Sequence, residues 1–286
     1  MPRFPAPHRY PALITALLLA VLTGTIHAGK IWYPVEVDVW EPPFNAELLR
    51  TQRQYTPLDK SSRRWNICVS IPHLKDAYWT AVNYGLIAEA RRLGVGLSLY
   101  EAGGYEHLDV QREQLEECLA NDIDGLIISA ITQDGLEDLV KTAADRGIPV
   151  LDLINGMSTS NLDARVAVDY GELAFQTGIY LRKLHPDSEQ PVRVAWFPGP
   201  DGAAWVAAGN AGFRDSLKGS PIEIISTRMG DTGLATQSRL IEHVLDEHAE
   251  TLDYIVGTTV TAEAAVDILR QRGLSKQIKV LSYYYS

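Results

Sequence analysis

The sequence is poor in positive charge. It contains 26 Lys and Arg residues against 36 Asp and Glu residues, which gives a formal net charge of −10. Loss of residues 1–28, interpreted below as a leader, would remove Arg3 and Arg9 and no acidic residue, and would make the chain two units more negative. Nucleic acids and anionic membranes attract positively charged surfaces. The charge balance therefore argues against a nucleic-acid partner.

The sequence also lacks the motifs of common hydrolases and zinc sites. None of its seven histidines forms a His-x-x-x-His pair, and no Gly-x-Ser-x-Gly motif occurs. We therefore expect no enzyme activity, no cofactor and no metal site, and we expect a binding protein instead.

Long apolar runs are absent after residue 24. The one such run, Ala12–Gly24, follows a start whose only charges are Arg3 and Arg9, and it is followed by Ile26-His27-Ala28. A basic start, a short apolar segment and a small residue at the exit are typical of a secretory signal peptide. A membrane anchor is the alternative, but the run is shorter than the ~20 residues that span a bilayer. Residues 1–28 are predicted to be a signal peptide.

Cysteine is rare, since Cys68 and Cys118 are the only two. An even number in an oxidising compartment permits one disulfide. Cys68 lies near the start of a predicted strand and Cys118 near the end of the second predicted helix. Because the helix of a β-α-β unit runs antiparallel to its strands, its end returns to where the strands begin. A Cys68–Cys118 disulfide is therefore expected, with a stabilisation of roughly 4 kcal/mol; two buried free thiols are the alternative.

Residues 29–65 differ in character from the rest. Val35, Val37 and Val39 alternate with polar or aromatic residues, which is a short strand signal. Prolines and a polar stretch follow. This segment is predicted to be an extended N-terminal arm that precedes the first domain.

From Trp65 onward, apolar strands alternate with helices. Near-continuous apolar strands in such an alternation are typical of a parallel sheet that helices cover on both faces. The pattern restarts after a short strand near residue 168, which predicts an α/β protein with two lobes, residues 66–168 and 169–281. The predicted strands are residues 66–71, 95–101, 124–128, 148–151, 165–168, 192–197, 222–227, 253–256 and 278–281, and the predicted helices are residues 76–93, 107–121, 133–146, 170–184, 203–218, 235–248 and 261–272.

Two such lobes behind a signal peptide resemble the type I periplasmic binding proteins. The segments that carry this resemblance are Asp124-Gly-Leu-Ile-Ile, Arg146-Gly-Ile-Pro-Val and the Tyr170–Leu181 helix. The resemblance implies a parallel sheet flanked by helices in each lobe, a ligand cleft at the hinge, and a location in the periplasm. Family members then return to lobe 1. Residues 282–286 are expected to begin this second crossover, and the remainder of lobe 1 is expected to be missing.

Further segments resemble family members that detect trimethylamine N-oxide together with a membrane histidine kinase. They are Trp65, Cys68, Leu74-Lys-Asp76-x-Tyr78-Trp79, Asn83-Tyr-Gly85, Glu101-Ala-Gly-Gly-Tyr105, Cys118, Pro198-Gly-Pro-Asp201 and Gly257-Thr-x-x-x-Ala262-Glu-Ala-Ala265. The resemblance implies a sensor that binds this N-oxide, or a similar methylated amine, and signals to the kinase of a two-component system. Two alternatives stay open: a solute-binding protein of an ABC transporter for a sugar-like or other small ligand, and a protein-binding adaptor with a vestigial cleft.

Candidate ligand-binding residues follow the predicted strands. In open α/β sheets, ligands bind beyond the carboxyl ends of the strands. The aromatic or acidic residues at these ends are Asp76, Tyr78, Trp79, Tyr105, Tyr170 and Tyr284. Aromatic faces suit the positively charged trimethylated nitrogen, while Tyr hydroxyls or an indole N–H can donate to the oxide. Asp76 can lie near the cationic side of the ligand.

Each candidate also has a structural interpretation. Asp76 is expected to cap its helix, and Trp79 shares a helix face with apolar residues of the core. Tyr170 can be only the first residue of its helix, and it stands where the resembling proteins carry a tryptophan, which leaves ligand choice open. In the run of three tyrosines near the end, strand alternation sends Tyr284 opposite to its neighbours, and we favour it for the cleft.

Overall fold

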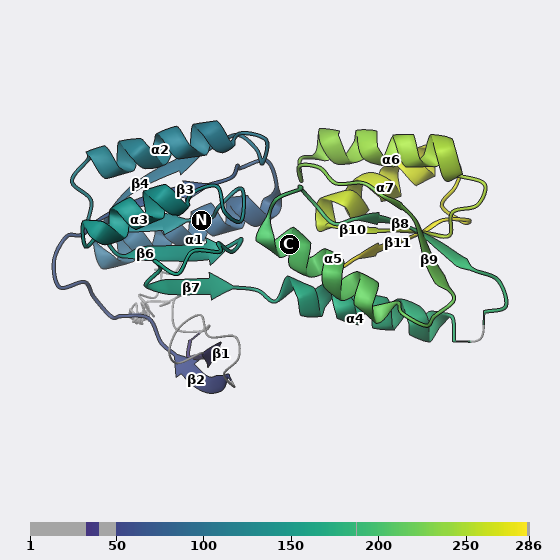
Figure 1. The fold of residues 1–286 in the computed structure, drawn as a ribbon, viewed down its shortest axis with the longest axis horizontal. Coiled ribbons are helices and arrows are strands. Elements are labelled where there is room, and N and C mark those ends of the chain that lie inside the picture. Colours follow the sequence, from purple (N-terminus) through teal and green to yellow (C-terminus); the bar gives the residue numbers. More distant parts are fainter. Residues whose placement is uncertain (1–32, 40–49, 187, 285–286) are drawn as a thin grey trace, which may run out of the picture.

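The computed structural model describes residues 33–39, 50–186 and 188–284. In this part of the chain, two α/β lobes lie side by side, with a small two-stranded sheet next to the first lobe (Figure 1). The predicted signal peptide lies outside the described residues. No helix in the described ranges is long and apolar enough to cross a membrane.

Lobe 1 contains a five-stranded parallel sheet in the order β4-β3-β5-β6-β7. Its elements are β3 (Asn66–Ile71), α1 (Ala77–Leu93), β4 (Gly96–Glu101), α2 (Leu108–Ala120), β5 (Gly125–Ile128), α3 (Glu137–Asp145), β6 (Val150–Ile154) and β7 (Ala164–Ala167). The alternation that the sequence predicts is confirmed.

Lobe 2 repeats the design with a four-stranded parallel sheet in the order β11-β10-β8-β9. Its elements are α4 (Tyr170–Leu184), β8 (Val192–Phe197), α5 (Ala204–Ser216), β9 (Ile222–Thr227), α6 (Leu234–His248), β10 (Tyr254–Gly257), α7 (Thr259–Gln271) and β11 (Lys279–Ser282). Helices α4 and α5 pack together on one face, and α6 and α7 on the other (Figure 1). The predicted two-lobed α/β fold is therefore confirmed.

Local chemistry fixes the ends of α1. The Asp76 carboxylate accepts a hydrogen bond from the Trp79 main-chain N–H at 2.9 Å and caps the helix. Gly94 ends it with φ of 70°, in the left-handed region that glycine adopts without strain, and its N–H donates to the carbonyl oxygen of Ala90. These caps set the helix directly after β3 and bring its first turn to the carboxyl end of the sheet.

Helix α3 begins at Glu137, four residues later than predicted. The residues before it form a turn, in which the Gly135 N–H donates to Thr132 Oγ1 at 3.0 Å. The Gln133 N–H instead donates to the carbonyl oxygen of Gly202 in lobe 2, at 2.9 Å. This segment therefore forms a contact between the lobes in place of a first helical turn.

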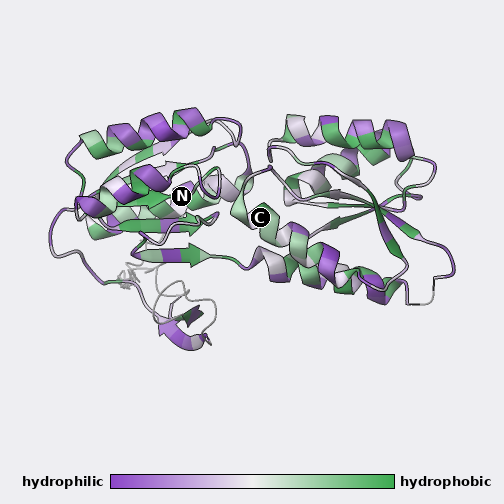
Figure 2. Ribbon diagram, in the orientation of Figure 1, coloured by the Kyte–Doolittle hydropathy of each residue, from purple (hydrophilic) through white to green (hydrophobic). Residues whose placement is uncertain are grey.

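The two faces of the lobe-1 sheet are covered unequally. The face under α2 and α3 carries a large, fully buried core. On the α1 face, the buried apolar side chains are Val69, Ile71 and Trp79, and their apolar neighbours are only partly buried. One helix covers that face, whereas two cover the other. Figure 2 shows that the strands and the inner faces of the helices are mainly apolar, whereas the outer faces of the helices are mainly polar.

The predicted N-terminal arm includes β1 (Val35–Val39) and β2 (Thr51–Tyr55), which pair antiparallel. The valine alternation indicated the first of these strands, but Thr-Gln-Arg-Gln-Tyr has no alternating apolar pattern that would indicate the second. Arg50, next to β2, forms an ion pair with Asp169 at 3.2 Å. Asp169 caps α4 and lies in the connection from β7 of lobe 1 to α4 of lobe 2, so the arm contacts the segment that joins the two lobes.

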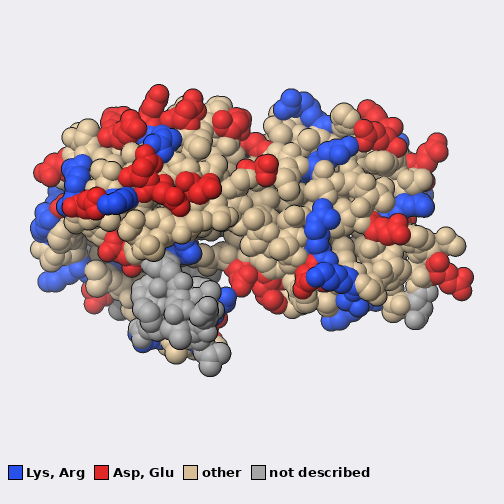
Figure 3. Space-filling view, viewed as in Figure 1, with Lys and Arg blue, Asp and Glu red and all other residues tan. Residues whose placement is uncertain are grey.

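Acidic side chains gather on one side of lobe 1. Figure 3 shows them over the region of α2 and α3. Some have basic partners, such as Asp138 with Arg112 at 2.6 Å. This face presents mainly negative charge to an approaching partner.

Candidate functional site

Loops from the two lobes meet at the carboxyl ends of their sheets. His73 follows β3 in lobe 1, and its Nε2 lies 3.0 Å from Oγ1 of Thr232, which follows β9 in lobe 2. The Tyr105 main-chain N–H, after β4, donates to Asp231 Oδ2 at 3.0 Å. The carboxyl edges of both sheets, where ligands bind in open α/β sheets, therefore face each other.

Five aromatic residues lie at this junction, and we call them the interlobe aromatic cluster: Tyr78, Tyr105, Tyr170, Trp205 and Tyr284. Two come from lobe 1: Tyr78 lies in the first turn of α1, and Tyr105 lies in the loop after β4. The other three come from the first residues of α4 and α5 and from the segment after β11. Every member thus stands at an element end, where chain topology brings separate segments together.

The rings of the cluster contact one another edge to face or at a tilt. Trp205 lies 5.2 Å from Tyr170, 6.1 Å from Tyr284 and 6.3 Å from Tyr105, measured between ring centroids. Tyr284 lies 5.5 Å from Tyr170 and 6.4 Å from Tyr78. The Tyr170 hydroxyl donates to the Tyr78 hydroxyl at 3.3 Å and so connects the lobes. Several π faces therefore converge on one small region.

Four of the six predicted ligand-site residues belong to this cluster, and Asp76 borders it. One Asp76 oxygen caps α1, and the other accepts a hydrogen bond from Thr232 Oγ1 at 3.2 Å. Both roles considered for Asp76, capping and a place at the site, are therefore compatible.

Trp79 is the predicted residue that stands apart. Its side chain is only 3% exposed and packs in the lobe-1 core with Val69 and Ile71. It contacts Tyr78 at 5.6 Å and His73 at 6.2 Å between ring centroids. Trp79 thus packs between the lobe-1 core and Tyr78 of the cluster. Its direct contact with a ligand stays a prediction.

The adjacent tyrosines after β11 have different partners, although their own rings lie 4.8 Å apart between centroids. Tyr283 packs on Trp196 in lobe 2, and its hydroxyl donates to the carbonyl oxygen of Pro198 at 2.7 Å. Tyr284 faces Tyr78 and the rest of the cluster. Because β11 ends at Ser282, the expected strand alternation does not separate the two rings, and the choice of Tyr284 rests on its contacts with the cluster. Tyr285 lies outside the described residues.

Burial keeps the tyrosine hydroxyls of the cluster neutral. It raises the pKa of Tyr105, Tyr170 and Tyr284 above the usual range, and Asp76 adds to the effect at Tyr105 and Tyr284. These hydroxyls therefore remain hydrogen-bond donors at every physiological pH. Asp76 is the carboxylate that acts on both Tyr105 and Tyr284, whereas the groups that act on Tyr170 are the neighbouring tyrosines.

A directed chain of hydrogen bonds crosses between the lobes through His73. The Lys75 main-chain N–H donates to His73 Nδ1 at 3.2 Å, so Nδ1 is an acceptor and the ring proton resides on Nε2. Nε2 then donates to Thr232, and Thr232 donates to Asp76. This order requires a neutral imidazole. Burial lowers the pKa of His73, against the opposing effect of Asp76 and Asp231, and thus favours that neutral form.

Asp231 is the second link between the lobes. Besides the Tyr105 N–H, it accepts from the Gly233 N–H at 2.7 Å and from Lys75 Nζ at 3.3 Å. Burial works to raise the pKa of Asp231, but these donors and the nearby His73 outweigh it and lower the pKa. The ionised carboxylate is therefore the form that fits the contact between the lobes.

Asn155 positions two members of the cluster. Its Nδ2 donates to the Tyr105 hydroxyl at 3.1 Å, and its carbonyl oxygen accepts from the Trp205 main-chain N–H at 3.2 Å. The preceding residue, Ile154, has φ of 71°, a left-handed conformation that is costly for a β-branched side chain. Strain is thus stored next to the site, in the loop that aligns its rings.

Sequence reasoning did not assign His73, Asn155, Trp205, Asp231 or Thr232 to the site. A signal was present for all five, because each follows a strand at its carboxyl end. His73 follows β3, Asn155 follows β6, Trp205 follows β8, and Asp231 and Thr232 follow β9. The position alone marks them as candidates. Their contacts between the lobes required the relative placement of the lobes, which a strand pattern does not supply.

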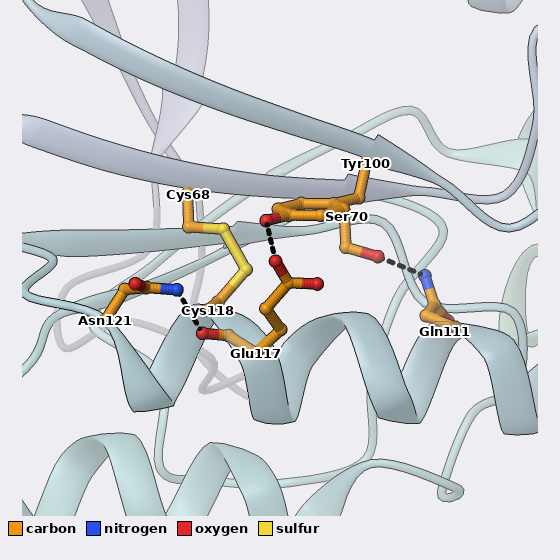
Figure 4. Close-up of a disulfide and its surroundings, with 7 residues drawn as sticks. All are labelled: Cys68, Ser70, Tyr100, Gln111, Glu117, Cys118 and Asn121. Carbon is orange, nitrogen blue, oxygen red and sulfur yellow. Dashed lines mark hydrogen bonds between the residues drawn. A yellow bond between two sulfur atoms is a disulfide. The ribbon is translucent and has the colours of Figure 1, made fainter.

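The structure joins Cys68 and Cys118 by a disulfide with the Cα atoms 6.0 Å apart (Figure 4). Beside it, the Tyr100 hydroxyl donates to Glu117 Oε1 at 3.0 Å. The bond connects β3 to the C-terminal turn of α2, near the amino ends of the strands. It therefore lies at the opposite end of the lobe-1 sheet from the aromatic cluster.

Sequence comparison places the chain among known binding proteins. A family model described as a periplasmic binding protein domain matches residues 67–285. Periplasmic protein TorT of Escherichia coli (strain K12) is 35% identical over 253 residues, which cover 86% of this chain and 71% of TorT. The D-ribose/D-allose-binding protein of Pseudomonas aeruginosa is 25% identical over 175 residues, or 59% of this chain and 54% of that protein.

Solved structures with the same fold include two kinds of protein. An ABC transporter solute-binding protein from Bradyrhizobium sp. BTAi1, with bound Bis-Tris, is 44% identical with a TM-score of 0.69 and is matched over 89% of this chain and 76% of its own. TorT in complex with the TorS sensor domain, in the presence of trimethylamine N-oxide, is 32% identical with a TM-score of 0.66, over 78% and 74%. The chain therefore belongs to the periplasmic binding protein family, whose members bind solutes and are not enzymes, and within that family it is TorT-like.

Proposed function

We propose that this chain is a periplasmic sensor component that binds trimethylamine N-oxide, or a similar methylated amine, between its lobes and signals to a membrane histidine kinase. The observation that carries the proposal is the interlobe aromatic cluster, in which Trp205 lies 5.2 Å from Tyr170 and Tyr284 lies 5.5 Å from Tyr170. The similarity to TorT, which occurs in complex with the TorS sensor domain, supports the partner.

The chemistry of the ligand matches this surface. Three methyl groups spread positive charge over an apolar cap, and aromatic faces attract such a cap by about 0.5–2 kcal/mol for each contact. Tyr78, Tyr105, Tyr170 and Tyr284 would supply such faces. Asp76, which borders the cluster, would complement the positive nitrogen. A sugar, in contrast, would need several polar groups directed at its hydroxyls.

Signalling follows from the position of the site between two lobes. A ligand held by Tyr78 on lobe 1 and by Tyr170 and Tyr284 on lobe 2 favours the arrangement in which the lobes touch. The shift equals the difference in affinity between the touching and separated arrangements. The kinase would read that arrangement at the surface of the chain.

A second candidate function is a solute-binding protein of an ABC transporter. The Bradyrhizobium structure favours it, because that protein is 44% identical to this chain. Its bound Bis-Tris is a tertiary amine, so this relative also accommodates an amine. The two candidates therefore differ mainly in the partner, which is a kinase in one case and a permease in the other.

The test is a calorimetric titration of the full chain, expressed with its own N-terminus and checked for folding by circular dichroism. Trimethylamine N-oxide is expected to bind saturably, and ribose, the control, is expected to give no heat of binding. Binding of ribose alone would favour the transporter function. A folded chain that binds neither compound would contradict the proposed ligand class.

A further inference from the structure

The indole N–H of Trp205 has no hydrogen-bond partner. The side chain is 6% exposed, and its Nε1 is fully buried. Within the described ranges, three other buried side-chain atoms also lack a partner: Gln114 Oε1, Ser129 Oγ and Ser226 Oγ. Trp205 is the one of the four that belongs to the interlobe aromatic cluster. A buried donor without an acceptor is costly, and native proteins seldom leave one so.

The orientation of this indole is fixed from two sides. Its own main-chain N–H is held by the carbonyl oxygen of Asn155 at 3.2 Å. Gly199, with φ of 122°, lets the six-membered ring lie against the loop backbone, since a Cβ there would be 2.5 Å from Cη2 of Trp205. The ring cannot turn to find a partner without a shift of that loop. The unused donor is therefore a built feature of the site.

No nearby hydroxyl forms a hydrogen bond of normal geometry with this indole N–H. The Trp205 side chain acts on the Tyr105 hydroxyl as a hydrogen-bond donor would and works to lower its pKa, but no hydrogen bond of normal geometry joins the two groups. The hydroxyl is held instead by Asn155, since it donates to Oδ1 at 3.4 Å and accepts from Nδ2 at 3.1 Å. The Tyr170 hydroxyl donates to Tyr78. Trp205 thus keeps a donor for a group that the protein itself does not supply.

We propose that the Trp205 Nε1–H recognises an oxygen acceptor on the ligand, and that the site selects amines whose cationic nitrogen carries such an oxygen. This inference rests on the proposed function and adds to it a residue and a selectivity rule. Indole N–H is donor only, so it matches an N-oxide oxygen and offers nothing to a methyl group. Amine N-oxides should therefore bind better than quaternary ammonium ions of the same shape.

The test compares trimethylamine N-oxide with tetramethylammonium, in which a methyl group replaces the oxygen. Both affinities are measured by calorimetry on the full chain and on the Trp205→Phe variant, which keeps an aromatic face and loses the N–H. The wild-type chain is expected to prefer the N-oxide by about tenfold or more. The variant is expected to lose about 10- to 100-fold in N-oxide affinity and no more than about threefold for tetramethylammonium.

Trp196→Phe is the matched control. Trp196 is also buried in lobe 2, but its Nε1–H already donates to Asn210 Oδ1 at 3.1 Å. The control should leave the ratio of the two affinities unchanged. If Trp205→Phe does not fold, benzothienylalanine at position 205 keeps the bicyclic shape and replaces N–H by sulfur.

Two outcomes would overturn the inference while the proposed function stands. In the first, the wild-type chain binds both compounds equally well. In the second, Trp205→Phe weakens both by the same factor, which would assign Trp205 to packing alone. A wild-type chain that binds neither compound would overturn the proposed function as well, so the two failures are distinguishable.

Discussion

The main-chain N–H of Tyr105 donates to the carboxylate of Asp231 at 3.0 Å, which joins the loop after β4 in lobe 1 to the loop after β9 in lobe 2. Asp231 is 8% exposed and also accepts from the Gly233 N–H and from Lys75. The carboxylate therefore connects the lobes through both a backbone group and a charged side chain. The lobe contact and the proposed ligand site share this region, since the Tyr105 ring belongs to the aromatic cluster.

Asp231→Asn should loosen the contact between the lobes. The amide keeps one acceptor but loses the charge that attracts Lys75, at a cost of about 1–3 kcal/mol. We expect a larger radius of gyration by small-angle X-ray scattering and an affinity for ligand that is about 5- to 100-fold lower. Asp215→Asn, on the exposed side of α5, is the control. Unchanged scattering and affinity would show that Asp231 does not hold the lobes.

His73 should make binding sensitive to acid. Burial lowers its pKa below the usual value of about 6.5, with Lys75 acting in the same direction and Asp76, Asp231 and Glu101 opposing. The neutral ring fits the lobe contact, so its contribution is complete above about pH 6.5 and declines as the pH falls below that value. Asp231, whose pKa is also lowered, contributes to acid sensitivity only below about pH 4.

The measurement is ligand affinity between pH 7.5 and pH 4.5 for the wild-type chain and for His73→Gln. Glutamine can donate and accept as the neutral ring does, but it does not titrate. We expect the affinity of the wild-type chain to fall with acid more steeply than that of the variant. Because any titration of the ligand affects both proteins equally, parallel curves would rule out His73 as the titrating group.

Tyr284→Ala should weaken binding of a methylated amine. It removes the ring that faces Tyr78, Tyr170 and Trp205. Loss of one cation–π contact corresponds to an affinity about 2- to 30-fold lower. The matched control is Tyr84→Ala, because Tyr84 is 75% exposed on α1. Equal effects of the two substitutions in calorimetry would argue against a role for the cluster.

Trp79→Ala should act on stability. Trp79 lies in the lobe-1 core against Val69 and Ile71, and replacing such a residue by alanine typically costs about 3–5 kcal/mol. Chemical denaturation should show this loss, whereas Trp79→Phe, which keeps a ring in the core, should recover most of it. A variant with unchanged unfolding would contradict the core position of Trp79.

Reduction of the Cys68–Cys118 disulfide should lower stability but not ligand choice. The bond closes a loop across 50 residues, which corresponds to about 4 kcal/mol through the unfolded chain. It lies at the amino ends of the strands, away from the cluster. Chemical denaturation with and without reductant measures the loss of stability. A changed preference among ligands after reduction would indicate coupling that the structure does not explain.

The sequence predicted the fold because its strands are apolar on both faces. The alternation of strand and helix that begins with Asn66–Ile71 and the capped helix α1 repeats through both lobes. The prediction failed where tertiary contacts override local pattern. Residues 133–136 were predicted to begin a helix, yet the Gln133 N–H donates to the Gly202 carbonyl oxygen in lobe 2. The second strand of the N-terminal sheet, Thr51–Tyr55, has no apolar alternation and was missed.

The site was predictable where a side chain directly follows a strand. Tyr78, Tyr105, Tyr170 and Tyr284 were assigned from that rule and from family resemblance, and they meet in the structure. The partners that join the lobes were not predictable in the same way. The His73 and Thr232 side chains are 159 positions apart, and a hydrogen bond between them depends on how the lobes face each other.

Saturation-transfer NMR on the full chain tests most directly whether the aromatic cluster holds a methylated amine. Aromatic protons of the protein are saturated while the N-methyl signal of trimethylamine N-oxide is observed. We predict strong transfer to the N-methyl protons in the wild-type chain and a clear loss of transfer in Tyr284→Ala, with Tyr84→Ala unchanged. Absence of transfer in the folded wild-type chain, or equal transfer in all three proteins, would contradict the central claim.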